Sequence, residues 1–336
     1  MRVLFIGGTG DISTSVSRLA VERGIDLYLF NRGKTKTTVP GAETIIGDIR
    51  QPDVIKRLTE QVRFDAVVNW IAFVPEDIER DIELFRGRTN QYIFISSASA
   101  YQKPPLSPII TESTPLHNPY LAYSRNKAAC EQRLMSAYHS EQFPVTIVRP
   151  SHTYAQHIPS IIGGDQPFAL AERLLKGIPV IIHGDGSSLW TLTHAEDFAR
   201  GFVGLLAHPQ TIGHAVHITS DELLNWNQIH QVIADALGVE PHIVHIPSDF
   251  IARIDPGIGA GLLGDKTWSA VFDNTKIKRL VPDFKAVIPF HQGIRKVLAW
   301  FNEDLDRKYV DPQIQRSMDR IIDAYQLANS GANRTP

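Results

Sequence analysis

A tyrosine and a lysine stand four positions apart in the stretch Tyr123-Ser124-Arg125-Asn126-Lys127. Residues four apart lie on one face of a helix, so these two side chains can act together. An ammonium group beside a phenol favours the phenolate and lowers the pKa of the phenol from about 10 towards neutrality. Such a tyrosine can accept the proton of a substrate alcohol while a hydride leaves its carbon. The same spacing is common in helices without a function, so its meaning depends on the surrounding residues.

Serine hydroxyls follow an apolar run, Tyr92–Ile95, that predicts a buried strand. They stand in the order Ser96-Ser97-Ala98-Ser99. Residues just beyond the carboxyl end of a parallel strand face the ligand crevice of an α/β protein. A hydroxyl there can hydrogen-bond the reacting oxygen, although the start of a polar loop has the same composition.

A glycine-rich turn follows the first apolar run, Val3–Ile6, with the spacing Gly7-x-x-Gly10-x-x-Ser13. Glycines let the backbone turn tightly and approach a pyrophosphate, to which the next helix offers free N–H groups. An ordinary βα turn is the alternative interpretation. We expect a dinucleotide to be held by the residues of this loop, which are Gly7, Thr9, Gly10, Asp11 and Ile12.

The end of the second expected strand bears on the choice of nicotinamide cofactor. An acidic residue there would accept the 2′-hydroxyl of NAD, but this chain has Asn31 and Arg32, with Lys34 close behind. A guanidinium binds a 2′-phosphate well, so NADP(H) is favoured over NAD(H), unless the loop is simply solvated. Asp48, followed by Ile49, could accept the adenine amino group or cap the helix that begins near Pro52.

The elements that must position these residues follow a βαβα rhythm in the first half of the chain. Short β-branched runs alternate with helical patterns, which predicts an α/β protein with a Rossmann-type, doubly wound parallel sheet. The expected strands are Val3–Ile6, Leu27–Phe30, Thr44–Ile46, Ala66–Ile71, Tyr92–Ile95 and Val145–Val148. The expected helices are Ser13–Arg23, Asp53–Gln61, Pro75–Phe85 and Tyr120–Tyr138.

The second half is more mixed and predicts a smaller mixed α/β lobe that covers the substrate. Its expected helices are Gln166–Lys176, His194–Ala207, Asn225–Ala236, Pro289–Asn302 and Pro312–Leu327. We expect a dinucleotide-binding domain at 1–150, a substrate-binding lobe partly interleaved with it at 151–328, and a frayed tail at 329–336.

Composition excludes several classes of protein. The 336 residues carry 34 basic and 36 acidic side chains, and this net charge of −2 does not suit a protein that binds nucleic acid with its whole surface. The single cysteine, Cys130, excludes internal disulfides and resembles a packing residue, and no apolar run approaches the roughly 20 residues of a membrane span. The first apolar run is too short for a signal peptide, so we expect a cytoplasmic protein without a membrane partner.

In combination, these motifs resemble the short-chain dehydrogenase/reductase superfamily, in its extended branch of NAD-dependent epimerases, dehydratases and reductases. The resemblance covers roughly residues 1–300. It rests on the glycine loop, Asp48, Ile71-Ala72, Ser96-Ser97, Tyr123-x-x-x-Lys127, Arg149-Pro150, Gly184–Gly186, Thr193–Asp197 and Phe272–Lys276.

The resemblance implies a Tyr/Lys/Ser-assisted hydride transfer at a secondary alcohol or ketone of a sugar-like small molecule. Tyr123 would be the acid/base, and Lys127 would bind the nicotinamide ribose and lower the tyrosine's pKa. Ser97 would orient the substrate oxygen, because the family's hydroxyl precedes a Val-Tyr-like pair by three residues, as Ser97 precedes Ala100-Tyr101. Backbone and apolar contacts to the cofactor would come from Ile71, Ala72 and Pro150.

Departures from the family narrow the expected reaction. The 4,6-dehydratases carry an Asp-Glu pair where this chain has Ala98 and Ser99, which disfavours water elimination. Sugar-nucleotide epimerases place an arginine four residues before the family's histidine, here His194, but this chain has Trp190 there. A nucleotide diphosphate handle on the substrate is therefore not assured.

The short stretch 73–90 can form only one helix where the family often inserts two that build its dimer interface. We expect a monomer, or a dimer through a non-standard interface. This truncation and Asn31-Arg32-Gly33 resemble a divergent subgroup that includes chloroplast stem-loop RNA-binding proteins. The alternative function is therefore a catalytically inactive relative that binds a dinucleotide or RNA, although the intact Ser97, Tyr123 and Lys127 argue against it.

Thirteen histidines raise the question of a metal, but no pair has a compact helical metal spacing, and we expect no metal. His214 and His217 are three apart on an expected strand and should point to opposite faces. His152 and Trp190 are candidate substrate contacts, with a structural role as the alternative for the histidine. Tyr154, Trp190 and Trp226 could form an aromatic wall or pack in the core.

Overall fold

The computed structural model, which describes residues 1–162 and 166–332, contains a seven-stranded sheet in which all neighbours are parallel. The strands lie in the order β12 (His214–Ile218), β7 (Val145–Pro150), β5 (Tyr92–Ile95), β4 (Ala66–Asn69), β1 (Arg2–Ile6), β2 (Asp26–Asn31) and β3 (Glu43–Ile46). This order reverses direction at β1, as in Rossmann-type folds. The expected fold class is therefore confirmed, and each expected strand of the sheet ends within two residues of its observed bounds.

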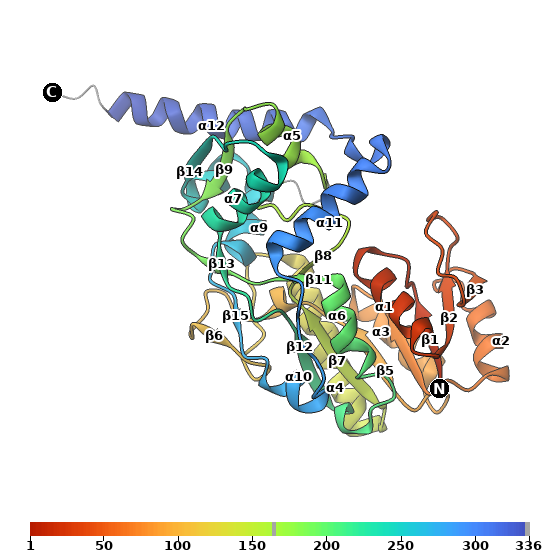
Figure 1. Cartoon of the computed structure of the whole chain (residues 1–336). Coiled ribbons are helices and arrows are strands. Elements are labelled where there is room, and N and C mark those ends of the chain that lie inside the picture. Colours follow the sequence, from red (N-terminus) through yellow and green to blue (C-terminus); the bar gives the residue numbers. More distant parts are fainter. Residues whose placement is uncertain (163–165, 333–336) are drawn as a thin grey trace.

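Both faces of the sheet are covered by helices (Figure 1). In β1, Val3 and Phe5 belong to one apolar core and Leu4 and Ile6 to the other. This double burial explains why the strand is a continuous apolar run. The first core includes residues of α1 (Asp11–Glu22) and α6 (Ala195–Val203), and the second includes residues of α2 (Asp53–Gln61), α3 (Pro75–Phe85) and α4 (Ala122–Glu141).

The second lobe has its own apolar core beyond the carboxyl ends of the sheet strands (Figure 1). Its helices are α5 (Ala169–Leu175), α7 (Trp226–Leu237), α8 (Ser248–Ile254), α9 (Pro256–Gly261), α11 (Phe290–Asn302) and α12 (Pro312–Ala332). Its strand pairs are β8 (His152–Tyr154) with β11 (Leu192–His194), β9 (Val180–His183) with β14 (Ile243–Ile246), β10 (Leu189–Trp190) with β13 (Leu224–Asn225), and β6 (Ile109–Ile110) with β15 (Val271–Phe272). Between these elements the chain returns to the sheet as α6, β12 and α10 (Thr275–Leu280), so the two parts are not separate in sequence.

Several expectations need correction. Residues 329–332, expected in a frayed tail, continue α12, and 333–336 lie outside the described residues. His194 ends β11 and caps α6 instead of belonging to that helix, because its ring accepts a hydrogen bond from the Glu196 N–H. Between β4 and β5 the chain forms a single helix, α3, with the bounds that the sequence indicates. No helix in the described part of the chain is both long and apolar enough to cross a membrane.

Candidate active site

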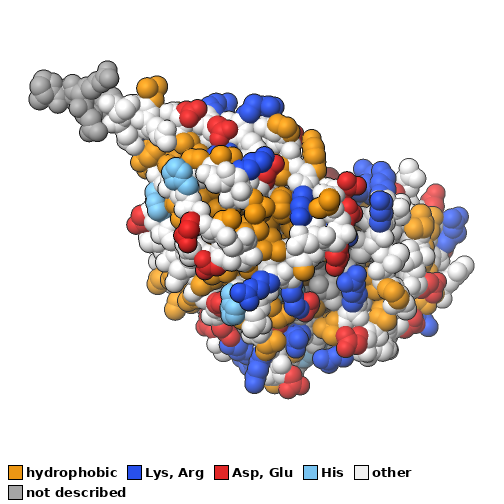
Figure 2. Space-filling view, turned by 45° about the horizontal axis from the view of Figure 1, so that its top comes forward, with side chains coloured by type: hydrophobic (Ala, Val, Ile, Leu, Met, Phe, Trp, Pro, Cys, Tyr) orange, Lys and Arg blue, Asp and Glu red, His pale blue; other side chains and the backbone are white. Residues whose placement is uncertain are grey.

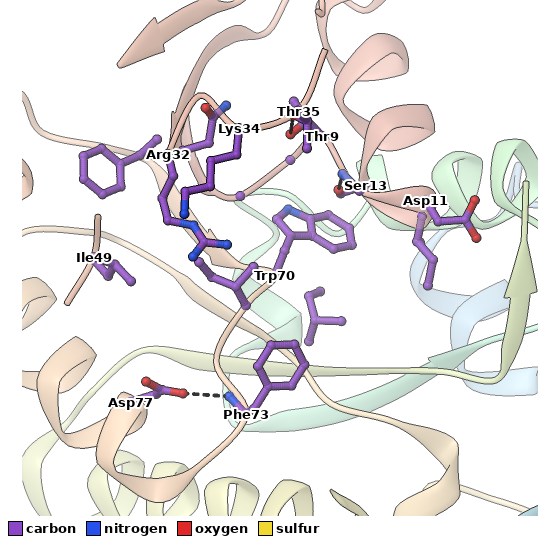
Figure 3. Close-up of a pocket in the computed structure, with 18 of the residues that line it drawn as sticks. Thr9, Asp11, Ser13, Arg32, Lys34, Thr35, Ile49, Trp70, Phe73 and Asp77 are labelled. Atoms are coloured by element: carbon purple, nitrogen blue, oxygen red, sulfur yellow. Dashed lines mark hydrogen bonds between the residues drawn. The ribbon is translucent and has the colours of Figure 1, made fainter. Parts of the chain in front are cut away.

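A cavity of about 700 Å³ lies at the carboxyl ends of the central strands, where the sheet order reverses (Figure 3). Crevices at this place in open α/β sheets bind ligands. The expected dinucleotide contacts that line the cavity are Gly7, Thr9, Gly10, Asp11, Ile12, Asn31, Arg32, Asp48, Ile49, Ile71 and Pro150. Ala72 does not line it, because its side chain is buried behind the wall.

The glycine loop approaches its neighbours so closely that side chains would not fit. Gly7 and Gly8 have φ angles of +94° and +104°, and a Cβ atom on Gly8 would lie 2.8 Å from Leu29 Cδ2. The Ser13 hydroxyl accepts a hydrogen bond of 2.9 Å from the Gly10 N–H, and Ser17 donates one of 2.8 Å to the Gly8 carbonyl. Ser13, which replaces the third glycine of the family pattern, therefore stabilises the loop.

The residues around this cavity fit a nicotinamide dinucleotide. The volume falls within the range of about 300–1,000 Å³ typical of cofactor sites, and the N-terminus of α1 opens onto it. The indole N–H of Trp70, which also lines the cavity, is buried and has no hydrogen-bond partner among the described residues. Sequence reasoning missed Trp70, Phe73 and Thr35, whose contribution depends on how the loops after β2 and β4 fold together.

Basic side chains gather at one end of the cavity, where Figure 3 shows Arg32 and Lys34 close together. The Asn31 side chain accepts a 3.0 Å hydrogen bond from the Gly33 N–H and stabilises this turn.

The Asp48 carboxylate accepts hydrogen bonds from the Arg50 side chain and N–H, which hold the pKa of this carboxyl well below the usual range. The capping role considered for Asp48 is wrong, because the helix after it has Pro52 at its N-cap and no side-chain cap.

Lys127 lies on the first turns of α4 beneath the cavity and is 1% exposed. Its ammonium donates hydrogen bonds of 2.7 Å to two carbonyls, that of Ala72 in the loop after β4 and that of Ile95, the last residue of β5. Burial lowers the pKa of Lys127 to about 8. An ammonium has three N–H donors, so one donor of Lys127 remains after these two hydrogen bonds.

Tyr123 differs from the expectation in its electrostatics. Its side chain is 45% exposed, and its ring centre lies 5.7 Å from Lys127 Nζ. Partial burial raises the pKa of the phenol, and a hydrogen bond with Ser97 offsets this only in part. The expected lowering by Lys127 is not observed, because that ammonium is directed at two backbone carbonyls.

The serine cluster separates into two roles. The Ser97 hydroxyl lies 2.9 Å from that of Ser99, and it partly offsets the rise in the pKa of the neighbouring Tyr123 phenol. Ser124 donates to Ser99 at 2.8 Å and ties this loop to α4. The Ser96 hydroxyl is instead buried and donates to the Glu131 carboxylate, so it has no role open to a substrate.

A buried ion pair supports this loop from behind. Arg149 donates to Glu131 at 2.5 Å and 2.9 Å, and both residues are at most 5% exposed. The Arg149 guanidinium also lies 4.8 Å from the ring centre of Tyr101. The sequence motif includes Arg149-Pro150, but Glu131 was not predicted as the partner of Arg149. The available signal was Arg149 itself, because a cation in a buried strand requires a carboxylate nearby.

A second cavity, of about 210 Å³, adjoins the first at Pro150 and contains the two expected substrate contacts, His152 and Trp190. The Trp190 indole donates a 3.0 Å hydrogen bond to His152 Nδ1. Burial lowers the pKa of His152 well below its usual value, so its ring is neutral and carries its proton on Nε2. Tyr154 and Trp226 are core residues, so the alternative of an aromatic wall is wrong for them.

Asp11 links the nucleotide loop to the second lobe. Its carboxylate accepts a 2.6 Å hydrogen bond from the Gln156 N–H and lies 2.6 Å from His157 Nδ1. Sequence reasoning assigned Asp11 to the cofactor and did not foresee these partners, which are 145 and 146 residues away.

The remaining side chains considered in the sequence do not form a site. Cys130 is fully buried, and burial raises its pKa to about 12, in line with a packing role. His214 is exposed and His217 is buried, as expected for opposite faces of β12. Among residues 1–162 and 166–332 no group of three or more His, Cys, Asp and Glu side chains could hold a metal ion.

Comparisons with known proteins agree with this geometry. The model of the "NAD dependent epimerase/dehydratase family" matches residues 3–219. A 2′-dehydrokanamycin reductase of Streptomyces kanamyceticus is 26% identical in an alignment of 293 positions that covers 85% of this chain and 80% of the reductase. The chloroplast stem-loop binding protein of 41 kDa b of Arabidopsis thaliana is 26% identical over 265 residues, covering 74% and 67% of the two chains. Among solved structures, UDP-glucose 4-epimerase of Thermotoga maritima matches with a TM-score of 0.72 at 18% identity, over 91% of this chain and all of the other.

Proposed function

Because the chain belongs to the NAD-dependent epimerase/dehydratase family, we propose that it is an NADP(H)-dependent oxidoreductase or epimerase acting on a secondary alcohol or ketone of a sugar-like substrate. The observation that carries this proposal is the meeting of Tyr123, Lys127 and Ser97 where the two cavities adjoin. When bound in the larger cavity, the nicotinamide supplies or accepts a hydride.

The residues of the chain would hold and move the proton. A phenol with a raised pKa is protonated at neutral pH, so Tyr123 is suited to donate its proton to a carbonyl oxygen. Ser97 would position that oxygen by a hydrogen bond. Lys127 would contribute its remaining N–H to the cofactor side of the site. In its protonated form Tyr123 is ready to act as the general acid of the reduction.

The basic end of the larger cavity supports NADP(H). Arg32 and Lys34 line it, and the Asn31 side chain is engaged within its own turn. Asp48, a carboxylate on the same wall, is held by Arg50. A 2′-phosphate placed here meets two cations, and a guanidinium can bind it bidentately.

The same arrangement disfavours dehydration. Ala98 and Ser99 follow Ser97, so neither position carries the additional acid or base that water elimination requires. Trp190 gives the smaller cavity an aromatic wall and uses its N–H on His152. The similarity to a 2′-dehydrokanamycin reductase supports a substrate without a nucleotide handle.

The test is NADPH consumption with a panel of sugar-ring ketones, for the wild type and Tyr123→Phe. We expect turnover in the variant to fall by about 10² to 10⁴, the usual contribution of a general acid, with the affinity for NADPH unchanged. Tyr120→Phe, which removes a nearby exposed hydroxyl, is the matched control and should keep its activity. Undiminished turnover in Tyr123→Phe would contradict the proposed role.

Binding of RNA is the second candidate function, favoured by the similarity to the chloroplast stem-loop binding protein. Acidic and basic side chains are interspersed on the face shown in Figure 2, and the net charge is −2, so the surface offers little electrostatic attraction. A gel shift with stem-loop RNA at low salt should show no complex. A salt-sensitive complex would favour this second function instead.

A further inference from the structure

Lys103 is a buried cation at the wall of the smaller cavity. Lys103 is 2% exposed, and it lines this cavity together with Ser97 and Ser99. Its ammonium makes no hydrogen bond or ion pair with any residue in the described ranges. The backbone is fixed, because the Lys103 N–H donates a 2.9 Å hydrogen bond to the His117 carbonyl. Lys103 Nζ is not among the fully buried side-chain atoms that lack a partner, so this ammonium reaches the open space of the cavity, where it is available to an anion.

A π-helical turn, Leu262–Lys266, brings two more charges to the same cavity, from Asp265 and Lys266. π-helical turns are rare and frequently lie at functional sites. This turn is tied to the serine loop by Asn118, whose amide donates at 2.6 Å to the Gly264 carbonyl and at 2.8 Å to that of Ser99. The charged groups are therefore held in a fixed position relative to the serine hydroxyls.

Donors predominate among the polar groups of this cavity. Lys103 and Lys266 each carry an ammonium, and the neutral His152 carries an N–H at Nε2. Asp265 is the opposing carboxylate, and its charge acts on Lys103 without a direct ion pair among the described residues. Burial lowers the pKa of Lys103, an effect that the charge of Asp265 opposes. With the ammonium groups charged, two cations face one anion, and this balance favours an anionic ligand.

We propose that the smaller cavity takes a single sugar ring that carries an anionic substituent, a carboxylate or a phosphate monoester, with the anion bound by Lys103 and Lys266. This inference rests on the proposed function and names its substrate class. The cavity's volume of about 210 Å³ is less than a third of the roughly 700 Å³ of the larger cavity, which suits one ring better than a sugar nucleotide. Asp265 and His152 would bind ring hydroxyls, and the reacting oxygen would face Ser97.

The experiment is a calorimetric titration of the NADP⁺-loaded protein with D-glucuronate, D-glucose 6-phosphate, D-glucose, D-glucosamine and UDP. We expect at least one of the two anionic sugars to bind ten times more tightly than glucose or more, and glucosamine to bind more weakly than glucose. The better of the two anions identifies the substituent. Binding of UDP that is tighter than that of both anionic sugars, or anions that bind no better than glucose, would overturn the proposal.

Lys103→Met is the decisive variant, with Lys285→Met, at an exposed position, as its matched control. Lys103→Met should lose the tenfold preference for the anion, while Lys285→Met keeps it. Because Lys103 has no partner in the described chain, Lys103→Met should unfold at the same temperature as the wild type or higher. A preference that survives in Lys103→Met would overturn the assignment of this lysine to the anion, and a marked loss of stability in that variant would assign it a structural role instead.

Failure of this proposal is distinguishable from failure of the proposed function. The titrations report binding and not turnover, and NADP⁺ affinity is measured separately for each variant. Undiminished turnover in Tyr123→Phe would remove the proposed mechanism and leave the anion preference standing. If the anion preference is absent but turnover falls in Tyr123→Phe as expected, only the assignment of the substrate class is contradicted.

Discussion

The buried pair Glu131–Arg149 provides a stringent test of how the serine loop is supported. In Glu131→Ala, the guanidinium of Arg149 retains its 3.0 Å hydrogen bond to the Glu112 carbonyl and its contact with the ring of Tyr101. It loses its carboxylate partner. Leaving one charge of a buried pair without its partner typically costs about 3–5 kcal/mol. The Ser96 hydroxyl would lose its acceptor at the same time.

The loss can be converted into an unfolding temperature. With an unfolding entropy of about 2.1 cal/mol/K per residue, the 336 residues give roughly 0.7 kcal/mol/K. If the two parts unfold together, Glu131→Ala should therefore lower the Tm by roughly 4–7 °C. The matched control is Glu79→Ala, which removes a surface partner of Arg133 at 2.5 Å. An exposed pair contributes at most about 1 kcal/mol, so this control should shift the Tm by no more than roughly 1–2 °C.

Circular dichroism on heating, supported by urea unfolding, measures both variants. The double variant Glu131→Ala, Arg149→Met removes both charges and should recover part of the loss, because apolar replacements of buried pairs are often neutral or better. If Glu131→Ala were no more destabilising than Glu79→Ala, the carboxylate would not be needed to neutralise Arg149. The account of how the serine loop is held would then be refuted.

Other predictions concern the cofactor end and the catalytic groups. Arg32→Ala should weaken NADPH binding about tenfold or more and leave NADH nearly unchanged, measured by titration of protein fluorescence; an equal loss for both would contradict the assignment of the 2′-phosphate. Ser97→Ala should lower kcat much more than Ser96→Ala, because Ser96 already binds Glu131, and steady-state kinetics will show which is affected. Lys127 has a pKa of about 8 in the folded protein and an ordinary value of 10.5 in the unfolded chain. Between about pH 8 and pH 10.5 the unfolded chain therefore holds a proton that the folded protein has released. The stability of the wild type relative to Lys127→Met should therefore rise, by roughly 3 kcal/mol, as the pH increases from about 8 to about 10.5, which urea unfolding at several pH values would measure.

The Rossmann-type sheet could be predicted from the sequence because it depends on local patterns. Val3–Ile6 reads as a continuous apolar run, which is the signature of a strand covered on both faces. The glycines of the first turn are required by backbone angles and close approach, as at Gly8, and such requirements are visible in the residue types. For the same reason the Tyr123-Lys127 spacing placed both residues correctly on one helix.

What escaped prediction depends on contacts between distant segments. Glu131 pairs with Arg149, Asp11 with Gln156 and His157, and Lys103 shares a cavity with a turn at Leu262–Lys266. The error in the pKa of Tyr123 has the same origin. Spacing shows that Lys127 lies on the same face as Tyr123, but not that the carbonyls of Ala72 and Ile95, from distant parts of the chain, hold its ammonium.

The small net charge of −2 conceals an uneven distribution of charge along the site. Cations lie at one end of the larger cavity, beneath its centre at Lys127, and in the smaller cavity at Lys103. Arg32 is exposed and remains hydrated, whereas Lys103 is 2% exposed, loses much of its hydration and forms no ion pair within the described chain. An anionic ligand that pairs with Lys103 should therefore raise the free energy of unfolding. The size of this increase depends on the ligand concentration relative to its Kd. We accordingly infer that the occupant of the smaller cavity contributes to the stability of the fold as well as to the specificity of the reaction.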